Sequence, residues 1–184
     1  FYSAETTLQF RKGVNRDVNG DGYSEMVIGA FGYNASQGRA YVFLGGPSGI
    51  PAPDATQRNY EIVGEATANN FGFLGAALGD INADGYADVA IGAEGYLGSQ
   101  GRAYVFHGGP GGIAQTTATS ANSKITGNTN QFARRLVTGD FNGDGYADLY
   151  VNAEAGASYI FHGSSTGISA TTFSGANTTL TGEG

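Results

Sequence analysis

Nine of the 16 carboxylates in this chain lie in three nine-residue windows with the pattern D-x-N-x-D-G-Y-x-[DE]. The windows begin at Asp17, Asp80 and Asp140. Carboxylates this close repel one another unless a cation or water offsets their charge. Side-chain oxygens at positions 1, 3 and 5 can converge on one point, because the glycine at position 6 permits a sharp turn and lets the next carbonyl face inward. Hard oxygen donors of this number suit Ca²⁺ better than Mg²⁺, which prefers a rigid octahedral site and keeps its waters. The pattern predicts three Ca²⁺ sites, one per window.

The windows match only the first half of an EF-hand. An EF-hand needs Glu at position 12, where this chain has Ile28, Ile91 and Val151. The last carboxylate instead falls at position 9, as Glu25, Asp88 and Asp148. The following residues have the character of a strand, so each window is expected to join two strands of a hairpin. Metal-free turns are the alternative, since Asp, Asn and Gly are ordinary turn formers. The first loop ranks lowest as a site because Glu25 is one methylene longer than Asp.

The windows recur because the whole chain repeats. The segment 36–43 returns letter for letter at 99–106, and the acidic windows begin 63 and then 60 residues apart. A looser third copy of the segment starts at Ala157. We therefore expect one module over residues 1–184, built from repeats at about 1–64, 65–127 and 128–184.

Each repeat has the pattern of four short strands, expected in the middle copy at 73–79, 88–93, 102–108 and 123–127. Alternating apolar residues and aromatic enrichment favour strands, and Gly-Gly-Pro and Asn-rich stretches favour turns. No segment keeps a 3.6-residue apolar period, so no long helix is expected. Tandem four-stranded units indicate an all-β fold of β-propeller blades, each made of four antiparallel strands.

Composition excludes several functions. The net charge is −7 with nine Lys and Arg among 184 residues, which argues against a nucleic-acid partner. The chain has no cysteine, so it has neither disulfides nor a thiolate metal site. No apolar run approaches the ~18 residues of a membrane span. The two histidines, His107 and His162, share one repeat position with Leu44 and are expected to be structural. With no catalytic constellation, the chain is not expected to be an enzyme.

The middle copy resembles an FG-GAP repeat. Phe71-Gly72, the acidic loop 80–88 and the following Val-Ala-Ile-Gly-Ala carry this resemblance. FG-GAP repeats are the blade units of the integrin α-subunit propeller and of many bacterial surface proteins. The resemblance implies Ca²⁺ held in the hairpin between the first two strands of each blade, in secreted or surface proteins engaged in adhesion. By position, it implies these ligands: Asp17, Asn19, Asp21, Tyr23 (carbonyl) and Glu25; Asp80, Asn82, Asp84, Tyr86 and Asp88; Asp140, Asn142, Asp144, Tyr146 and Asp148.

The chain departs from the family pattern at several positions. The proline of Gly-Ala-Pro is replaced by Phe31, Glu94 and Glu154, and Asn152 stands where glycine is expected. Phe-Gly becomes Phe-Ala at 132–133, and the first repeat has no clear equivalent. The pair at 134–135, two arginines found only in the third repeat, is expected to be solvated.

Three blades are fewer than the four to eight of closed propellers. The chain is therefore expected either to be part of a longer parent or to close a ring with another copy, two chains making six blades. The function expected is that of an extracellular or cell-surface module, of bacterial origin, that binds a protein or assembles with other modules. One alternative is a lectin-like propeller whose inter-blade aromatics are Tyr33 and Tyr96. Another is an accessory domain of a larger secreted enzyme.

Overall fold

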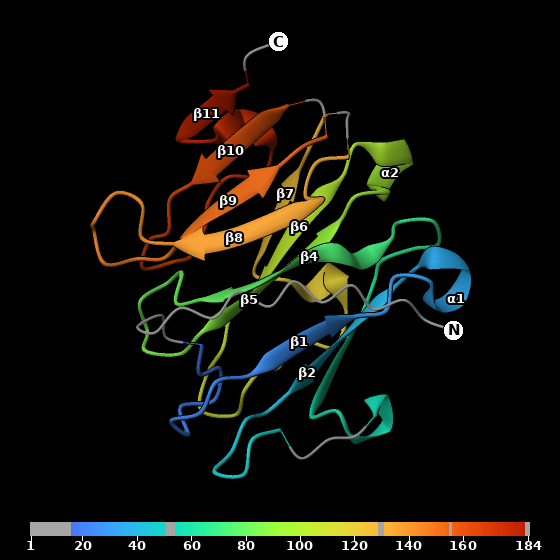
Figure 1. Cartoon of the computed structure of the whole chain (residues 1–184). Coiled ribbons are helices and arrows are strands. Elements are labelled where there is room, and N and C mark those ends of the chain that lie inside the picture. The colour runs from blue at the N-terminus through green and yellow to red at the C-terminus, as the bar shows by residue number, and fades with distance from the viewer. Residues whose placement is uncertain (1–15, 51–53, 129–130, 155, 183–184) are drawn as a thin grey trace.

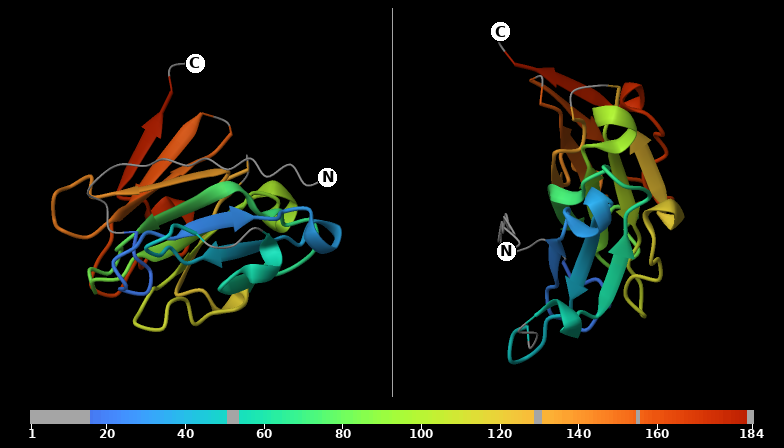
Figure 2. Two further views of the ribbon diagram at one scale, coloured as in Figure 1. Left: turned by 60° about the horizontal axis from the view of Figure 1, so that its bottom comes forward. Right: turned by 90° about the vertical axis from the view of Figure 1, so that its right-hand side faces the viewer.

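The computed structural model describes residues 16–50, 54–128, 131–154 and 156–182. Three antiparallel sheets follow one another in chain order, from the blue strands through green to orange and red (Figure 1). Figure 2 shows the same succession from two other sides. The all-β fold expected from the sequence is confirmed.

The sheets are meanders in which each strand pairs with the next. The first contains β1 (Met26–Gly29), β2 (Arg39–Phe43) and β3 (Tyr60–Val63). The second contains β4 (Phe71–Gly79), β5 (Asp88–Ala93), β6 (Arg102–Phe106) and β7 (Ser123–Thr126). The third contains β8 (Arg135–Gly139), β9 (Asp148–Asn152), β10 (Ala157–Phe161) and β11 (Thr178–Thr181). The four strands predicted for the middle copy are all present, with ends shifted by at most two residues.

Helical segments are short in the part of the chain that the structure describes. The turn α1 (Tyr33–Ser36) follows β1 in the first repeat, and the turn α2 (Tyr96–Ser99) follows the equivalent strand β5 in the second repeat. Three 3₁₀ turns, Ala55–Gln57, Ala118–Ser120 and Phe173–Gly175, precede the last strand of each sheet. In these described residues, no helix has the length and apolar character needed to cross a membrane.

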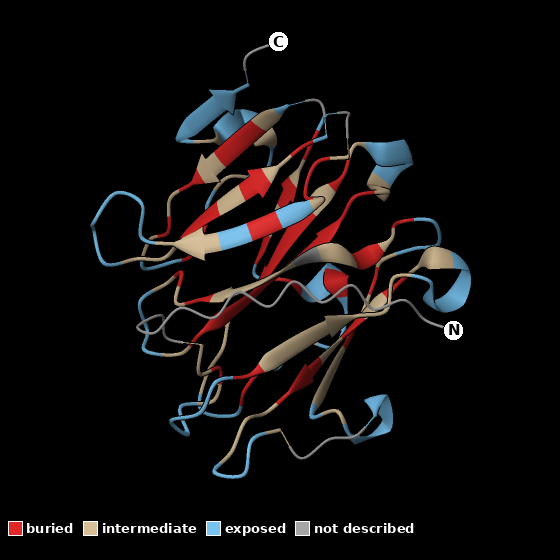
Figure 3. Ribbon diagram, in the orientation of Figure 1, coloured by how far each residue is buried: buried red, intermediate tan, exposed pale blue. Residues whose placement is uncertain are grey.

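Two hydrophobic cores lie between successive sheets. One joins the first and second sheets, and the other joins the second and third. Strand β5 contributes to both: Val89 and Ile91 enter the first core and Ala90 enters the second, because alternate residues of a strand point to opposite faces. All of β5 is consequently buried (Figure 3). The middle sheet is held on both faces.

The sheets approach so closely that glycine is needed at one point of each contact. A Cβ added to Gly29 would lie 1.8 Å from the carbonyl oxygen of Gly72 in the next sheet. A Cβ on Gly92 would lie 1.9 Å from the carbonyl oxygen of Ala133. These are the glycines of the Val-Ile-Gly-Ala and Val-Ala-Ile-Gly-Ala segments. Their role is to allow the close approach of the neighbouring sheet's backbone.

Substituting Gly92 with alanine is expected to destabilise the fold, because the new methyl group would overlap backbone that cannot rotate away. We expect a loss of about 1–3 kcal/mol in the free energy of unfolding, measured by denaturant titration. The matched control is Gly32→Ala, where nothing lies within 4 Å and φ is −74°. The control should change stability by no more than about 1 kcal/mol, in the stabilising direction. Equal effects of the two substitutions would contradict this account of the sheet contact.

Candidate metal centres

The three acidic loops lie along one side of the molecule, at the left of Figure 1. The second loop joins β4 to β5 and the third joins β8 to β9, while the first leads into β1. The second and third loops are therefore hairpin connections, as the sequence predicted, whereas the residues before the first loop lie outside the described part of the chain.

Backbone N–H groups hold the side chains of each loop at positions 1, 3 and 5. In the second loop, the carboxylate of Asp80 accepts hydrogen bonds from the N–H groups of Asp84 at 3.1 Å and Gly85 at 3.0 Å. The side-chain oxygen of Asn82 accepts from the Asp84 N–H at 3.1 Å, and Asp84 itself accepts from the Tyr86 N–H at 3.0 Å. The same bonds from the N–H groups at the fifth, sixth and seventh positions recur in the other loops. The loops are turns held in shape by hydrogen bonds from their own backbone to these side chains.

The glycine at position 6 is required by the backbone. Gly22, Gly85 and Gly145 have φ values of +90°, +94° and +91°. Residues with a Cβ rarely adopt this conformation. The sharp turn predicted from the sequence is present in all three loops.

The carboxylate at position 9 lies beneath each loop. Asp88 and Asp148 are fully buried and Glu25 is nearly so. One oxygen of Asp88 accepts a hydrogen bond from the Ile81 N–H at 2.8 Å, and the other accepts from the Gly108 N–H at 3.0 Å. Asp148 accepts in the same way from Phe141 and Gly163. This carboxylate joins the loop to the chain that leaves the third strand of the sheet.

The buried carboxylates have no positive partner among the described residues. Burial raises the pKa of Asp88 to about 7, against the lowering effect of its two N–H donors and with Asp84 and Asp80 adding to the rise. Burial likewise raises the pKa of Glu25 to about 7, with Asp17 and Asp21 nearby. Neither carboxylate forms an ion pair in the described part of the chain. A cation bound here would remove this unfavourable clustering of negative charge.

The first loop has the tightest cluster of carboxylates. One oxygen from each of Asp17, Asp21 and Glu25 lies within 4.8 Å of the others. Two ligands of one Ca²⁺ ion lie at most about 5 Å apart, since each is 2.3–2.6 Å from the ion. Among the described residues, no other group of three ionisable side chains has its ligand atoms this close together. The longer Glu25 therefore reaches the other two carboxylates, so its extra methylene gives no ground for ranking this loop lowest.

The backbone of each loop also contacts the next sheet. The carbonyl of Asp17 accepts a hydrogen bond from the Ala87 N–H at 2.8 Å, and the carbonyl of Asp80 accepts from the Ala147 N–H at 2.9 Å. The carbonyl of Val18 accepts from the Gly109 N–H at 3.0 Å. The order of a loop and the contact between sheets are therefore linked.

The remaining candidates from the sequence have structural surroundings. Burial lowers the pKa of His107, which is one of the two histidines expected to be structural. The guanidinium carbons of Arg39 and Arg102 lie 3.2 and 3.7 Å from the ring centroids of Tyr33 and Tyr96. Each tyrosine expected at an inter-blade lectin site thus has one face covered by an arginine of its own repeat.

The expectation that Arg134 is solvated is wrong, because its side chain forms ion pairs. Its guanidinium pairs with Glu94 of the second sheet at 3.5 Å and with Glu154 of the third. At the corresponding place between the first and second sheets, the rings of Phe31 and Phe73 meet edge to face, 4.7 Å apart. Two of the residues that replace the family's proline, Phe31 and Glu94, therefore have a partner across the sheet contact. Sequence alone missed this because the pairing depends on how two sheets are placed.

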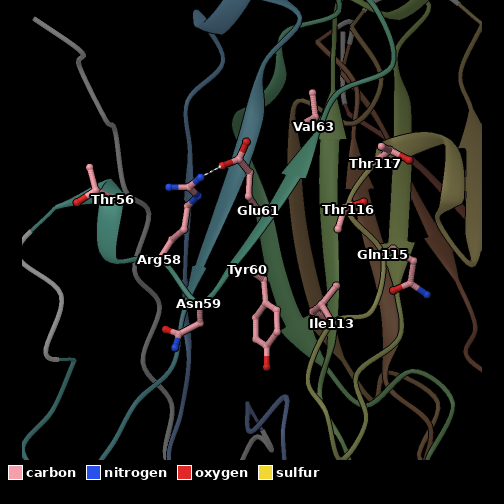
Figure 4. Close-up of a pocket in the computed structure, with 10 residues that line it drawn as sticks. All are labelled: Thr56, Arg58, Asn59, Tyr60, Glu61, Val63, Ile113, Gln115, Thr116 and Thr117. Atoms are coloured by element: carbon pink, nitrogen blue, oxygen red, sulfur yellow. Dashed lines mark ion pairs between the residues drawn. The ribbon is translucent and has the colours of Figure 1, made fainter.

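A pocket of about 670 Å³ lies outside the loops, between β3 and the segment that precedes β7 (Figure 4). Its lining includes Tyr60, whose hydroxyl donates to the carbonyl of Gly111 at 2.9 Å. Gln115, also in the lining, has a buried side-chain oxygen with no hydrogen-bond partner. Nothing in the sequence marked this pocket, because its walls come from two repeats.

Two family models match the chain. The FG-GAP repeat model matches residues 13–43, and the FG-GAP-like repeat model matches residues 80–151. Together these matches span more than half of the chain.

Several known proteins are similar to the chain. Integrin alpha-E of Mus musculus is 32% identical over 155 residues, which cover 77% of this chain and 13% of the relative. Integrin alpha-IIb of Homo sapiens is 35% identical over 150 residues, covering 74% of this chain and 14% of the relative. Phosphatidylinositol-glycan-specific phospholipase D of Mus musculus is 32% identical over 147 residues, or 74% of this chain and 17% of the relative.

The chain thus spans only a small fraction of the length of each of these relatives. The similarity concerns the repeat region, whose sequence markers and stacked antiparallel sheets agree with the matched models. The chain belongs to the FG-GAP repeat family, and its sheets are the β-propeller blades that such repeats form.

Proposed function

We propose that this chain is an extracellular calcium-binding propeller module that serves adhesion, protein binding or assembly rather than catalysis. The observation that carries the proposal is the buried carboxylate at position 9 of each loop. It lies beneath the acidic side chains at positions 1 and 5, and its only described polar partners are backbone N–H groups. Ca²⁺ would supply positive charge there and a cross-link between the two ends of the loop.

The proposed ligands are the side chains at positions 1, 3, 5 and 9 and the carbonyl at position 7 of each loop. This gives about three ions per chain, one per blade. Because Asp17 and Asp80 also present their carbonyls to the next blade, an ordered loop would hold successive blades together. The role of the ion would be structural. An extracellular or cell-surface location, where Ca²⁺ is abundant, suits such a module, and similarity to integrin alpha subunits supports a role in adhesion.

The partners of the module would be a protein ligand and further blades. Closed propellers usually have four to eight blades. We propose that the further blades come from the same parent chain or from another copy of the chain, so that the ring is completed by a neighbouring module.

The inter-blade pocket favours a second candidate, a lectin-like propeller. Its polar lining and the ring of Tyr60 offer the hydrogen bonds and apolar surface that a sugar needs. A third candidate is an accessory domain of a secreted enzyme, because one similar protein is a phospholipase. That candidate requires a catalytic domain elsewhere in the parent chain.

Calcium titration by isothermal calorimetry is expected to give about three sites per chain. Asp84→Ala, which removes a side chain at position 5, should lower the stoichiometry to about two. The matched control is Ala83→Gly in the same loop, which copies the glycine present at this position in the other loops. The control should leave the stoichiometry unchanged. Unchanged stoichiometry in Asp84→Ala would show that the second loop is a metal-free turn.

Calcium should also raise the thermal stability of the chain. A site that binds only the folded chain adds about 2.7 kcal/mol when free ion is 100 times its Kd. Melting temperature is therefore expected to rise with Ca²⁺ and to fall in excess chelator, as measured by scanning calorimetry. Magnesium at the same concentration should have a smaller effect. A melting temperature that ignores both ion and chelator would contradict the proposal.

A glycan array tests the lectin-like candidate. That candidate predicts binding of at least one oligosaccharide, with loss of the signal in Gln115→Ala, which removes a polar group from the pocket. Leu97→Ala, on the distant turn α2, should retain the signal. An array with no binding would rule this candidate out and favour the protein-binding module.

A further inference from the structure

Asparagine is followed directly by glycine at two places in this chain, and both lie in acidic loops. Asn19 and Gly20 occupy positions 3 and 4 of the first loop, and Asn142 and Gly143 occupy the same positions of the third. In the second loop, alanine stands at position 4. The chain therefore contains two Asn-Gly pairs and, in an equivalent turn, one natural comparison.

An Asn-Gly pair is chemically reactive because its backbone can attack its own side chain. The glycine nitrogen attacks the side-chain carbonyl carbon of the asparagine, and the new C–N bond closes a five-membered succinimide. The side-chain nitrogen takes up the proton of the glycine N–H and leaves as ammonia. Water then opens the ring to aspartate or to isoaspartate, in which the main chain runs through the side-chain carbon. Glycine favours the attack because it has no Cβ to hinder the close approach.

The first and third loops place a proton acceptor at the attacking nitrogen. The N–H of Gly20 donates to a carboxylate oxygen of Asp17 at 2.6 Å, and the N–H of Gly143 donates to Asp140 at 2.7 Å. Among the described residues, the N–H of Ala83 in the second loop has no hydrogen-bond partner. A carboxylate in this position can accept the proton that the nitrogen loses as the ring closes.

The asparagine amide is held by two hydrogen bonds. The side-chain oxygen of Asn142 accepts from the Asp144 N–H at 3.0 Å, and its side-chain nitrogen donates to the Asp144 carboxylate at 2.8 Å. Asn19 makes the same two bonds with Asp21, at 3.2 and 2.9 Å. The N–H favours the negative charge that develops on the carbonyl oxygen during attack. Asn82 makes these bonds too, so the residue at position 4 is what sets the second loop apart.

The two Asn-Gly pairs differ in their surroundings. Asn142 and Gly143 are exposed, and no described atom lies within 4 Å of a Cβ position on Gly143. Asn19 is half-buried, and the ring of Tyr86 lies 2.7 Å from the Cβ position of Gly20. Ring closure needs the side chain to move and ring opening needs water, so the pair in the third loop is the more reactive.

We propose that Asn142 and Asn19 are sites of spontaneous deamidation, in that order of rate, when the loops hold no cation. The covalent modification goes beyond the proposed function, whereas its dependence on Ca²⁺ rests on that function. Both asparagines are proposed ligands, so a bound ion would hold the amide oxygen and the carboxylate at position 1 in place. Loss of the ion would then allow an irreversible change, which adds a carboxylate at position 3 or lengthens the loop by one backbone atom.

Incubation of the whole chain in excess chelator, followed by peptide mapping with tandem mass spectrometry, tests the proposal. Each conversion raises the mass of a peptide by one unit, and isoaspartate separates from aspartate in chromatography. Asn142 is expected to convert first and Asn19 second. Asn82 and the exposed Asn177, which is followed by threonine, should keep their amides over the same period. Saturating Ca²⁺ should slow both conversions.

Exchanging position 4 between loops gives matched variants that leave every proposed ligand unchanged. Gly143→Ala copies the second loop and should lower the conversion of Asn142 to the level of Asn82. Ala83→Gly copies the other two loops and should make Asn82 convert. Positive φ values occur at position 4 in all three loops, and Ala83 shows that alanine is accepted there.

Asp140→Asn tests the proton acceptor in the third loop. The new side chain keeps an oxygen for the Gly143 N–H but removes the carboxylate. In chelator, the conversion of Asn142 is expected to slow, while Asn19 in the same molecule keeps its native rate and serves as the internal control.

The outcomes separate this inference from the calcium proposal. Conversion of Asn82 as fast as that of Asn142, or a native rate of Asn142 conversion in Gly143→Ala, would overturn the inference. Conversion confined to Asn142 and Asn19 at equal rates with and without Ca²⁺ would support the two modification sites and contradict the proposed function.

Discussion

The close contact between successive blades is the constraint on which the rest of the structure depends. Neither apolar core belongs to one blade, since each combines side chains of two neighbouring sheets. A single blade buries too little surface to be stable by itself. The backbone positions at Gly29 and Gly92 show how little space the contact leaves, because a single added carbon would overlap the neighbouring chain. A side chain added at either glycine would therefore force the neighbouring backbone to move.

The acidic loops are part of the same contact. Their side chains accept hydrogen bonds from the backbone of their own loop, while the carbonyls of Asp17 and Asp80 accept hydrogen bonds from the next blade. The buried carboxylates of Glu25 and Asp88 carry the electrostatic cost of this arrangement, which appears as a raised pKa. A bound cation would reduce that cost and fix the loop from which the inter-blade bonds extend. Metal affinity and blade assembly would then be coupled through the same few residues.

The two inter-blade contacts use different chemistry at one equivalent place. An aromatic pair, Phe31 and Phe73, meets there between the first two blades, and the ion pair of Glu94 and Arg134 meets there between the second and third. Phe31 and Glu94, two of the residues that stand in place of the family's proline, thus each have a partner in the next blade.

The sequence by itself determined the repeat, the all-β class, the four strands of the middle blade and the glycine turn in each acidic loop. These features are local: strand alternation, turn-forming residues and the glycine at position 6 act over a few residues. Only the tertiary structure decided what lies between repeats. It revealed the burial of Asp88 beneath its loop, the partners of Arg134, the inter-blade pocket and the exposure of Phe141. Each of these depends on the placement of one sheet against the next, and that placement cannot be predicted from the spacing of residues within a repeat.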